Sequence, residues 1–291
     1  MRGDPVPSLN CSYDPAARYD VREADETYRS GPDGDWPVRF YQPQGPGPFP
    51  ALLDVHGGAW STGSYLNNER VDRALAASGI LVAAIEFRQA PKHPYPAQVA
   101  DANYGTRWLK ARAADYNGDP ASVAGLGTSS GGHTLLLSAL RPTDPRYAAM
   151  AVPRGDGLDA SLRYAITGWP VLDAHARYIY AKEAGQDRLM KSSDNYFGTE
   201  AVMQEGSPQQ VLERGDNTAL PPVLILQGTN DDNVPLSISE RFVATYRGLG
   251  GEIERELFPG MPHAFAREAG PATDRAIALI KAFIGRQLND A

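Results

Sequence analysis

The chain has 291 residues, and its 35 acidic side chains outnumber its 28 lysines and arginines, which gives a formal net charge of −7. Apolar residues make up 42% and charged residues 22%, proportions that exclude a disordered chain. No run of 18 apolar residues predicts a membrane span, and acidity without basic clusters argues against nucleic acid or an anionic membrane as partner. The single cysteine excludes an internal disulfide and a cysteine-based zinc site.

Length and even composition predict one α/β domain over residues 1–291. The start of the chain, Met1 to Asp4, lacks the charged and then apolar pattern of a signal peptide, so we expect a cytoplasmic protein. Residues 1–35 are polar and rich in turn formers, which indicates an N-terminal extension. The sequence leaves a homo-oligomer open.

Short apolar runs along the chain predict eight strands. Several are apolar throughout, as strands are when helices cover both faces of a parallel sheet. The expected strands are Val21–Tyr28, Val38–Tyr41, Ala51–Val55, Ile80–Glu86, Ser122–Leu126, Tyr164–Thr167, Val223–Gln227 and Ile253–Phe258.

Helical patterns lie between these strands, and their alternation predicts a mostly parallel sheet with right-handed crossovers. The last pattern places Ile277, Ile280 and Ile284 on one helical face. Residues from about 172 to 214 are helical but irregular, and we interpret them as a small lid inserted before the strand at 223–227. The expected helices are Glu69–Ser78, Ala97–Ala114, Gly131–Leu140, Leu236–Leu249 and Asp274–Leu288.

A Gly-Thr-Ser-Ser-Gly segment at 127–131 directly follows a predicted strand and directly precedes a predicted helix. In this setting G-x-S-x-G is typical of a nucleophile elbow, a sharp turn that presents the serine hydroxyl above the sheet. Gly127 and Gly131 would let the strand and helix approach closely, and the helix N-terminus behind Ser129 would favour developing negative charge.

Chance and a dinucleotide-binding loop are the alternative interpretations of this segment. With so many glycines in the chain, the pattern has a chance of roughly one in six of arising somewhere at random, so it is weak on its own. Residues 125–127 also begin like a dinucleotide-binding loop, but the sixth position is Ser130, where that loop has Gly or Ala.

A serine hydroxyl needs an adjacent base that a third group holds in place. His263 lies in the loop after the last predicted strand and is the candidate base. Asp231 and Asp232 follow the preceding strand, and the spacing Gly-x-x-Asp-x-x-Val-Pro selects Asp231 as the acid. The plainer interpretation of both aspartates is a turn before a helix.

The segment His56-Gly-Gly-Ala-Trp follows another predicted strand, and its glycines free the backbone to present N–H groups to an oxyanion. We assign Gly58 and Ala59 as donors, with the backbone N–H of Ser130 as the third. His56 is expected to hold the loop by hydrogen bonds. No pair of histidines has metal-ligand spacing with a suitable acid, so we expect no metal and no cofactor.

Together these motifs resemble the α/β-hydrolase superfamily, and more closely the carboxylesterases of the hormone-sensitive-lipase and bacterial feruloyl-esterase-like type. Residues 56–60 resemble their His-Gly-Gly-x oxyanion motif, and residues 87–96 resemble their Tyr-Arg-Leu-Ala-Pro-Glu-His-Pro-x-Pro segment. Ala59 followed by Trp60 moves the likeness toward feruloyl-esterase-like and arylformamidase-like members. The resemblance implies an α/β-hydrolase fold with an eight-stranded, mostly parallel sheet flanked by helices.

The resulting hypothesis is a serine hydrolase that cleaves small to medium acyl or aryl esters through an acyl-enzyme. The expected partner is a small-molecule ester. The alternatives are an arylformamidase or amidase on the same fold, a peptidase, and a binding protein on a hydrolase scaffold. Four residues are candidates for the substrate pocket: Trp60, Trp169, His175 and Tyr178. For the aromatic residues among them, packing in the core is the simpler interpretation.

Overall fold

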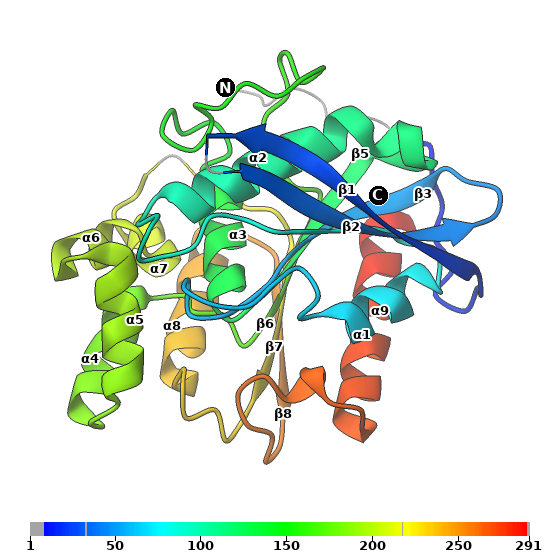
Figure 1. The fold of residues 1–291 in the computed structure, drawn as a ribbon. Helices are drawn as coiled ribbons and strands as arrows, with labels where there is room; N and C mark the ends of the chain where they lie inside the picture. Colours follow the sequence, from blue (N-terminus) through cyan, green and yellow to red (C-terminus); the bar gives the residue numbers. More distant parts are fainter. Residues whose placement is uncertain (1–8, 33, 217, 290–291) are drawn as a thin grey trace.

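The computed structural model describes residues 9–32, 34–216 and 218–289 (Figure 1). Within these residues a single eight-stranded sheet has the order β1-β2-β4-β3-β5-β6-β7-β8. The pairs β1–β2 and β2–β4 are antiparallel, and every other neighbouring pair is parallel. The mostly parallel eight-stranded sheet predicted from the sequence is therefore confirmed.

The strands fall where the apolar runs predict them, with the largest differences at strand ends. The β1–β2 hairpin extends beyond the expected bounds. Most of the additional residues are solvent-exposed and show no apolar pattern, so the sequence did not predict them as strand. The strands are β1 Asp20–Gly31, β2 Gly34–Gln44, β3 Phe49–Val55, β4 Leu81–Ile85, β5 Gly118–Thr128, β6 Ala165–Gly168, β7 Val223–Gly228 and β8 Ile253–Phe258.

Among the described residues the five predicted helices are present, and four further helices occupy the segment between β6 and β7. In the described part of the chain, no helix is both long and apolar enough to cross a membrane. Two short 3-10 helices cover Ala113–Tyr116 and Phe265–Arg267. The α-helices are α1 Glu69–Ala76, α2 Ala97–Arg112, α3 Ser130–Leu140, α4 Ala174–Glu183, α5 Asp187–Phe197, α6 Glu200–Glu205, α7 Pro208–Glu213, α8 Leu236–Gly248 and α9 Pro271–Asn289.

Helices cover both faces of the sheet. Helices α1 and α9 pack on one face, where Ile280 and Ile284 of α9 are buried as their spacing predicts. Helices α2, α3 and α8 contribute to the core of the other face. The four helices α4 to α7 gather at one side of the molecule, at the left of Figure 1. The sheet is therefore shielded on both faces, which explains its continuous apolar strands.

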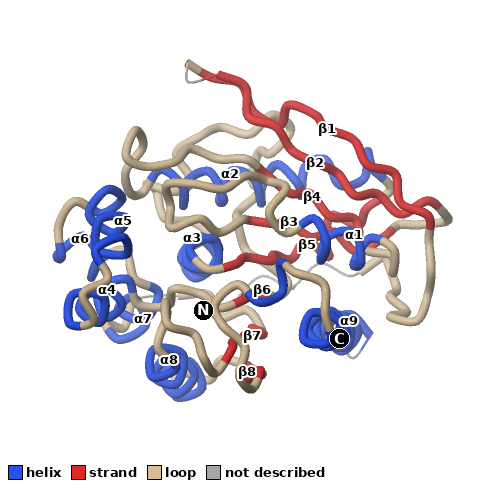
Figure 2. Tube along the Cα trace, turned by 60° about the horizontal axis from the view of Figure 1, so that its bottom comes forward, coloured by secondary structure: helices blue, strands red, loops and turns tan. Residues whose placement is uncertain are grey.

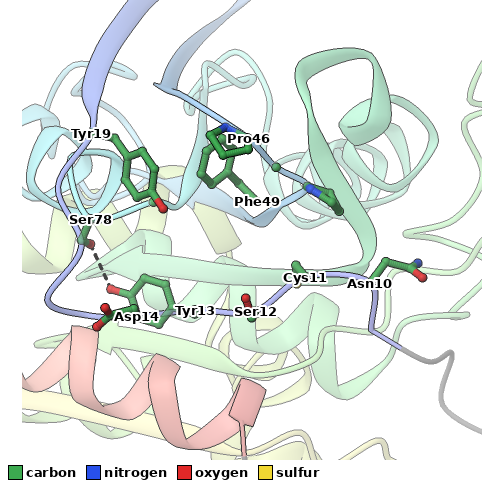
Figure 3. Close-up of a pocket in the computed structure, with 12 residues that line it drawn as sticks. Asn10, Cys11, Ser12, Tyr13, Asp14, Tyr19, Pro46, Phe49 and Ser78 are labelled. Carbon is green, nitrogen blue, oxygen red and sulfur yellow. Dashed lines mark hydrogen bonds between the residues drawn. The ribbon is translucent and has the colours of Figure 1, made fainter.

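Parallel strands bring their carboxyl ends to one edge of the sheet, and the loops after β3, β5, β7 and β8 meet there (Figure 2, where this edge comes forward). A small hollow of about 120 Å³ lies at the other end of β3, where Phe49 begins the strand (Figure 3). Tyr13 and Ser78 line it and share a hydrogen bond of 2.9 Å. The candidate catalytic residues all belong to the carboxyl edge.

Two acidic side chains, Asp54 of β3 and Asp72 of α1, are fully buried between the sheet and that helix. Asn68 donates a 2.8 Å hydrogen bond to one oxygen of Asp54. The other Asp54 oxygen and both Asp72 oxygens have no hydrogen-bond partner among the described residues. Burial raises the pKa of Asp54 to about 7, and burial together with the nearby Asp54 charge raises the pKa of Asp72 well above its ordinary value.

These raised pKa values predict that stability falls as pH rises, because the unfolded chain releases the protons at lower pH than the folded chain does. For Asp54 the loss begins near the ordinary value of 3.8 and continues to about 7. Asp72→Asn removes one of the two acids, so its melting temperature should decline less between about pH 5 and pH 8. The exposed carboxylate of Glu240 on α8 serves as the control, as Glu240→Gln, because it is not among the charges that act on Asp72. Identical declines in wild type and Asp72→Asn would contradict the prediction.

Candidate active site

Ser129 sits at the apex of the turn between β5 and α3, and its φ of +53° is a left-handed value that is costly for a non-glycine residue. The turn is held by its neighbours: the Ser129 N–H donates to the Gly168 carbonyl, 2.8 Å away, and the Ser129 carbonyl accepts from Val171 N at 3.2 Å. Both partners lie at or just after the end of β6. The predicted elbow is thus braced by the adjacent strand.

Gly131 explains why the helix can start directly behind the serine. A Cβ at this position would meet the carbonyl oxygens of Val55 and His56, well inside the 3.0 Å that real Cβ atoms essentially never cross. The first turn of α3 therefore packs on the end of β3 only with glycine at 131. This contact also sets the distance between the serine turn and the segment 56–60.

The structure brings the three predicted catalytic side chains together. The Ser129 hydroxyl oxygen lies 2.9 Å from Nε2 of His263. On the other side of the ring, Nδ1 lies 3.0 Å from each carboxylate oxygen of Asp231. A proton on Nδ1 facing the carboxylate leaves Nε2 free to accept the serine proton.

Asp231, and not its neighbour Asp232, faces the histidine. The Asp231 side chain is buried, and one of its oxygens accepts hydrogen bonds from Asn233 N at 3.0 Å and Val234 N at 2.9 Å. Asp232 is exposed, and its backbone carbonyl accepts a hydrogen bond from the hydroxyl of Tyr180. These backbone donors fix the orientation of the carboxylate toward His263.

The segment 56–60 bends sharply beside the serine, with positive φ at Gly58, Ala59 and Trp60. Trp60 N donates to the Ser130 side chain at 3.2 Å, which ties this segment to the first turn of α3. Among the described residues, no acceptor takes the N–H groups of Gly58 and Ala59. The Ser130 N–H lies in the first helical turn, where such groups have no intrahelical acceptor.

Two buried histidines support this region. The ring of His56 contacts the carbonyl of the next residue at 2.7 Å and Glu86 at 3.3 Å, as expected for a residue that holds the loop. His133 accepts a hydrogen bond from Trp60 Nε1 at 3.2 Å, so its Nε2–H donates to the Gly206 carbonyl at 2.6 Å. Burial lowers the pKa of His133 to about 4, which keeps it neutral.

Of the four predicted pocket residues, Trp169 lies nearest the triad in the contacts the structure describes. Its ring centroid is 6.3 Å from that of His263, and its indole N–H is buried without a partner among the described residues. Trp60 is 1% exposed and stacks on Tyr196 at 5.3 Å, so its ring belongs to the core beside the site.

The two remaining pocket candidates lie in the predicted lid. His175 pairs with Glu200 of α6 at 2.9 Å, a contact between two helices of the segment. Tyr178 is half-buried and packs against the core cluster. Substrate contact by either residue stays a prediction.

Sequence reasoning missed Arg177 of α4, whose guanidinium donates hydrogen bonds to Asn233 in the loop that carries Asp231. The two residues are 56 positions apart. Arg177 belongs to no motif, and Asn233 stands at an unspecified position of the Gly-x-x-Asp-x-x-Val-Pro spacing. Their contact depends on how α4 packs beside the loop, and no local pattern carries that information.

Solved structures of esterases share this fold. Esterase 2 of Thermogutta terrifontis, phosphorylated by paraoxon, superposes with a TM-score of 0.73 at 23% identity and covers 90% of this chain and 93% of its own. The hyperthermophilic esterase of Pyrobaculum calidifontis also has a TM-score of 0.73 at 23% identity, with 92% of this chain and 86% of its own covered. The chain therefore has the α/β-hydrolase fold.

The family is shown by sequence: the BD-FAE family model matches residues 39–246, and the chain belongs to this family. Esterase LipC of Mycobacterium tuberculosis (strain ATCC 25618 / H37Rv) is 30% identical over 80% of this chain and 58% of its own length. Probable isoprenylcysteine alpha-carbonyl methylesterase ICME of Oryza sativa subsp. japonica is 27% identical over 79% and 56%. The chain spans a little over half of each relative. The expected resemblance to carboxylesterases is confirmed.

The contact at Gly131 predicts a specific intolerance. Gly131→Ala should lower the melting temperature and the yield of folded protein, because its methyl group would collide with backbone that cannot move aside. Gly285→Ala in the interior of α9 is the matched control. With space around it, this change should stabilise the protein by about 0.5–1 kcal/mol. Thermal unfolding measures both, and a Gly131→Ala protein as stable as wild type would refute the contact.

Proposed function

We propose that this chain hydrolyses carboxylic esters with Ser129 as nucleophile, His263 as general base and Asp231 as the acid that orients the histidine. The observation that carries the proposal is the continuous chain of contacts from the serine oxygen to the carboxylate, at 2.9 Å and 3.0 Å. The two relatives reported above are esterases by name, which supports ester cleavage as the reaction.

The first half-reaction follows from the geometry. Ser129 attacks the ester carbonyl while His263 takes its proton, and Asp231 stabilises the resulting imidazolium. The N–H groups of Gly58, Ala59 and Ser130 are proposed to hold the oxyanion of the tetrahedral intermediate. Losing one such donor typically costs about 2.7–4 kcal/mol of transition-state stabilisation.

The second half-reaction hydrolyses the acyl-enzyme. It begins once the first tetrahedral intermediate has collapsed, with the proton of His263 passing to the departing alcohol and the acyl group staying on Ser129. The neutral His263 then takes a proton from a water molecule as that water attacks the acyl carbonyl. The second tetrahedral intermediate releases the carboxylic acid, and the Ser129 oxygen takes the proton back from His263. We propose small to medium acyl or aryl esters as substrates, with Trp169 beside His263 as the aromatic wall of the pocket. Residues 172–214 are proposed to form a lid over this edge of the sheet.

The proposal predicts that Ser129→Ala lowers the rate of p-nitrophenyl ester hydrolysis by about 10⁴-fold or more, because the nucleophile is lost. Ser138→Ala removes another buried serine hydroxyl from the same helix region and should keep the wild-type rate. A substrate panel completes the test, with esters of graded chain length, aryl esters, N-formylkynurenine and an anilide.

Hydrolysis of esters alone would support the proposal. Faster cleavage of the formamide would replace it with an arylformamidase, and inertness toward the whole panel would replace it with a binding protein. Equal ester hydrolysis by wild type and Ser129→Ala would reject Ser129 as nucleophile.

A further inference from the structure

Helix α4 and the turn between α4 and α5 contact the loop that carries Asp231. The hydroxyl of Tyr180 and the amide of Gln186 each donate to the Asp232 carbonyl at 3.0 Å. Arg177 donates from Nε and Nη2 to the Asn233 side-chain oxygen, at 3.0 Å and 2.8 Å. The segment proposed as a lid is therefore bonded to the acid loop through three side chains.

Arg177 is unusual among these three because its charge is buried and lacks a carboxylate partner. The residue is 1% exposed, and Nη1 has no hydrogen-bond partner among the described residues. No carboxylate of those residues forms an ion pair with it. Burial and the nearby charge of Arg188 lower its pKa to about 10, while the charge of Asp231 acts in the opposite direction. A buried cation in this state contributes little to stability, since an apolar side chain of similar size often serves as well.

The contacts of Arg177 connect its buried charge to the catalytic residues. Its partner Asn233 donates its own backbone N–H to the Asp231 carboxylate at 3.0 Å. That carboxylate in turn contacts His263 Nδ1. The guanidinium also lies 5.6 Å from the ring centroid of Trp60, the residue after Ala59 in the segment beside the serine. Arg177 thus touches the supports of both the acid and the proposed oxyanion donors.

We propose that Arg177 is a positioning residue for the triad, which acts through Asn233 to hold the Asp231 carboxylate against His263. This inference rests on the proposed function. It makes the 172–214 segment part of the catalytic apparatus, because α4 supplies the side chain that fixes the acid loop. Arg177 itself would contact neither the substrate nor the reacting atoms.

Arg241 of α8 provides a matched control. It also bonds the 172–214 segment to the body of the protein, through Glu213 at 2.8 Å and Asp173 at 3.5 Å. The Glu213 contact does not lead to the triad, and the longer contact with Asp173 reaches the N-cap of α4 and not the guanidinium of Arg177. If anchoring the segment is all that Arg177 does, Arg241→Met and Arg177→Met should have similar effects on activity.

A double-mutant cycle separates positioning from anchoring. In the full-length protein, Arg177→Met should lower kcat for a p-nitrophenyl ester about tenfold and change KM by less than about twofold. In an Asp231→Asn background, adding Arg177→Met should cause no further loss, because the group it acts through is gone. Arg241→Met should leave kcat unchanged in both backgrounds. The rate of Ser129→Ala is subtracted as the blank.

Thermal unfolding runs beside the kinetics. Arg177→Met should melt at or above the wild-type temperature, since a buried unpaired charge has been removed. If Arg177→Met fails to fold, Asn233→Ala tests the positioning role instead. This change removes the side-chain oxygen that accepts from Arg177 and keeps the backbone N–H that faces Asp231. It should lower kcat in the wild-type background only. An unchanged kcat, or an equal loss in both backgrounds, would overturn the role of Arg177 while leaving the ester hydrolase proposal intact.

Discussion

The candidate site depends on three side chains, from loops far apart in the sequence, meeting within hydrogen-bond distance. Ser129, Asp231 and His263 follow β5, β7 and β8, whose carboxyl ends reach the same edge of the parallel sheet. Strand register sets the spacing of these loops, and glycine at 131 lets the serine turn lie against β3. The apolar strands therefore determine the geometry of the polar site.

Motif residues were predictable because each depends on local backbone geometry. The elbow at 127–131, the choice of Asp231 by its spacing and the supporting role of His56 are each predicted from neighbours in the sequence. The structure places Ser129, His263 and Asp231 in contact, and their catalytic roles stay a proposal. Strand ends in the β1–β2 hairpin were underestimated because exposed strand residues leave no apolar signal. Arg177 was missed because its role arises from packing between distant segments.

Several buried polar groups lie near this edge of the sheet, and each has at least one atom without a hydrogen-bond partner among the described residues. Asp54 and Asp72 keep carboxyl oxygens without partners beneath the site, and Arg177 keeps a guanidinium nitrogen unpaired beside the acid loop. Such groups add little to folding stability and restrict the conformations that their neighbours adopt. The proposed role of Arg177 is one instance of this use of a buried charge.

The central claim is that Ser129 is a nucleophile activated by His263. Labelling with a fluorophosphonate, followed by peptide mass mapping, tests it most directly because the reagent bonds covalently to activated serines. The account predicts a single adduct on the peptide that contains Ser129, and loss of labelling in His263→Ala. An adduct on another serine, or labelling that proceeds equally fast without His263, would contradict it.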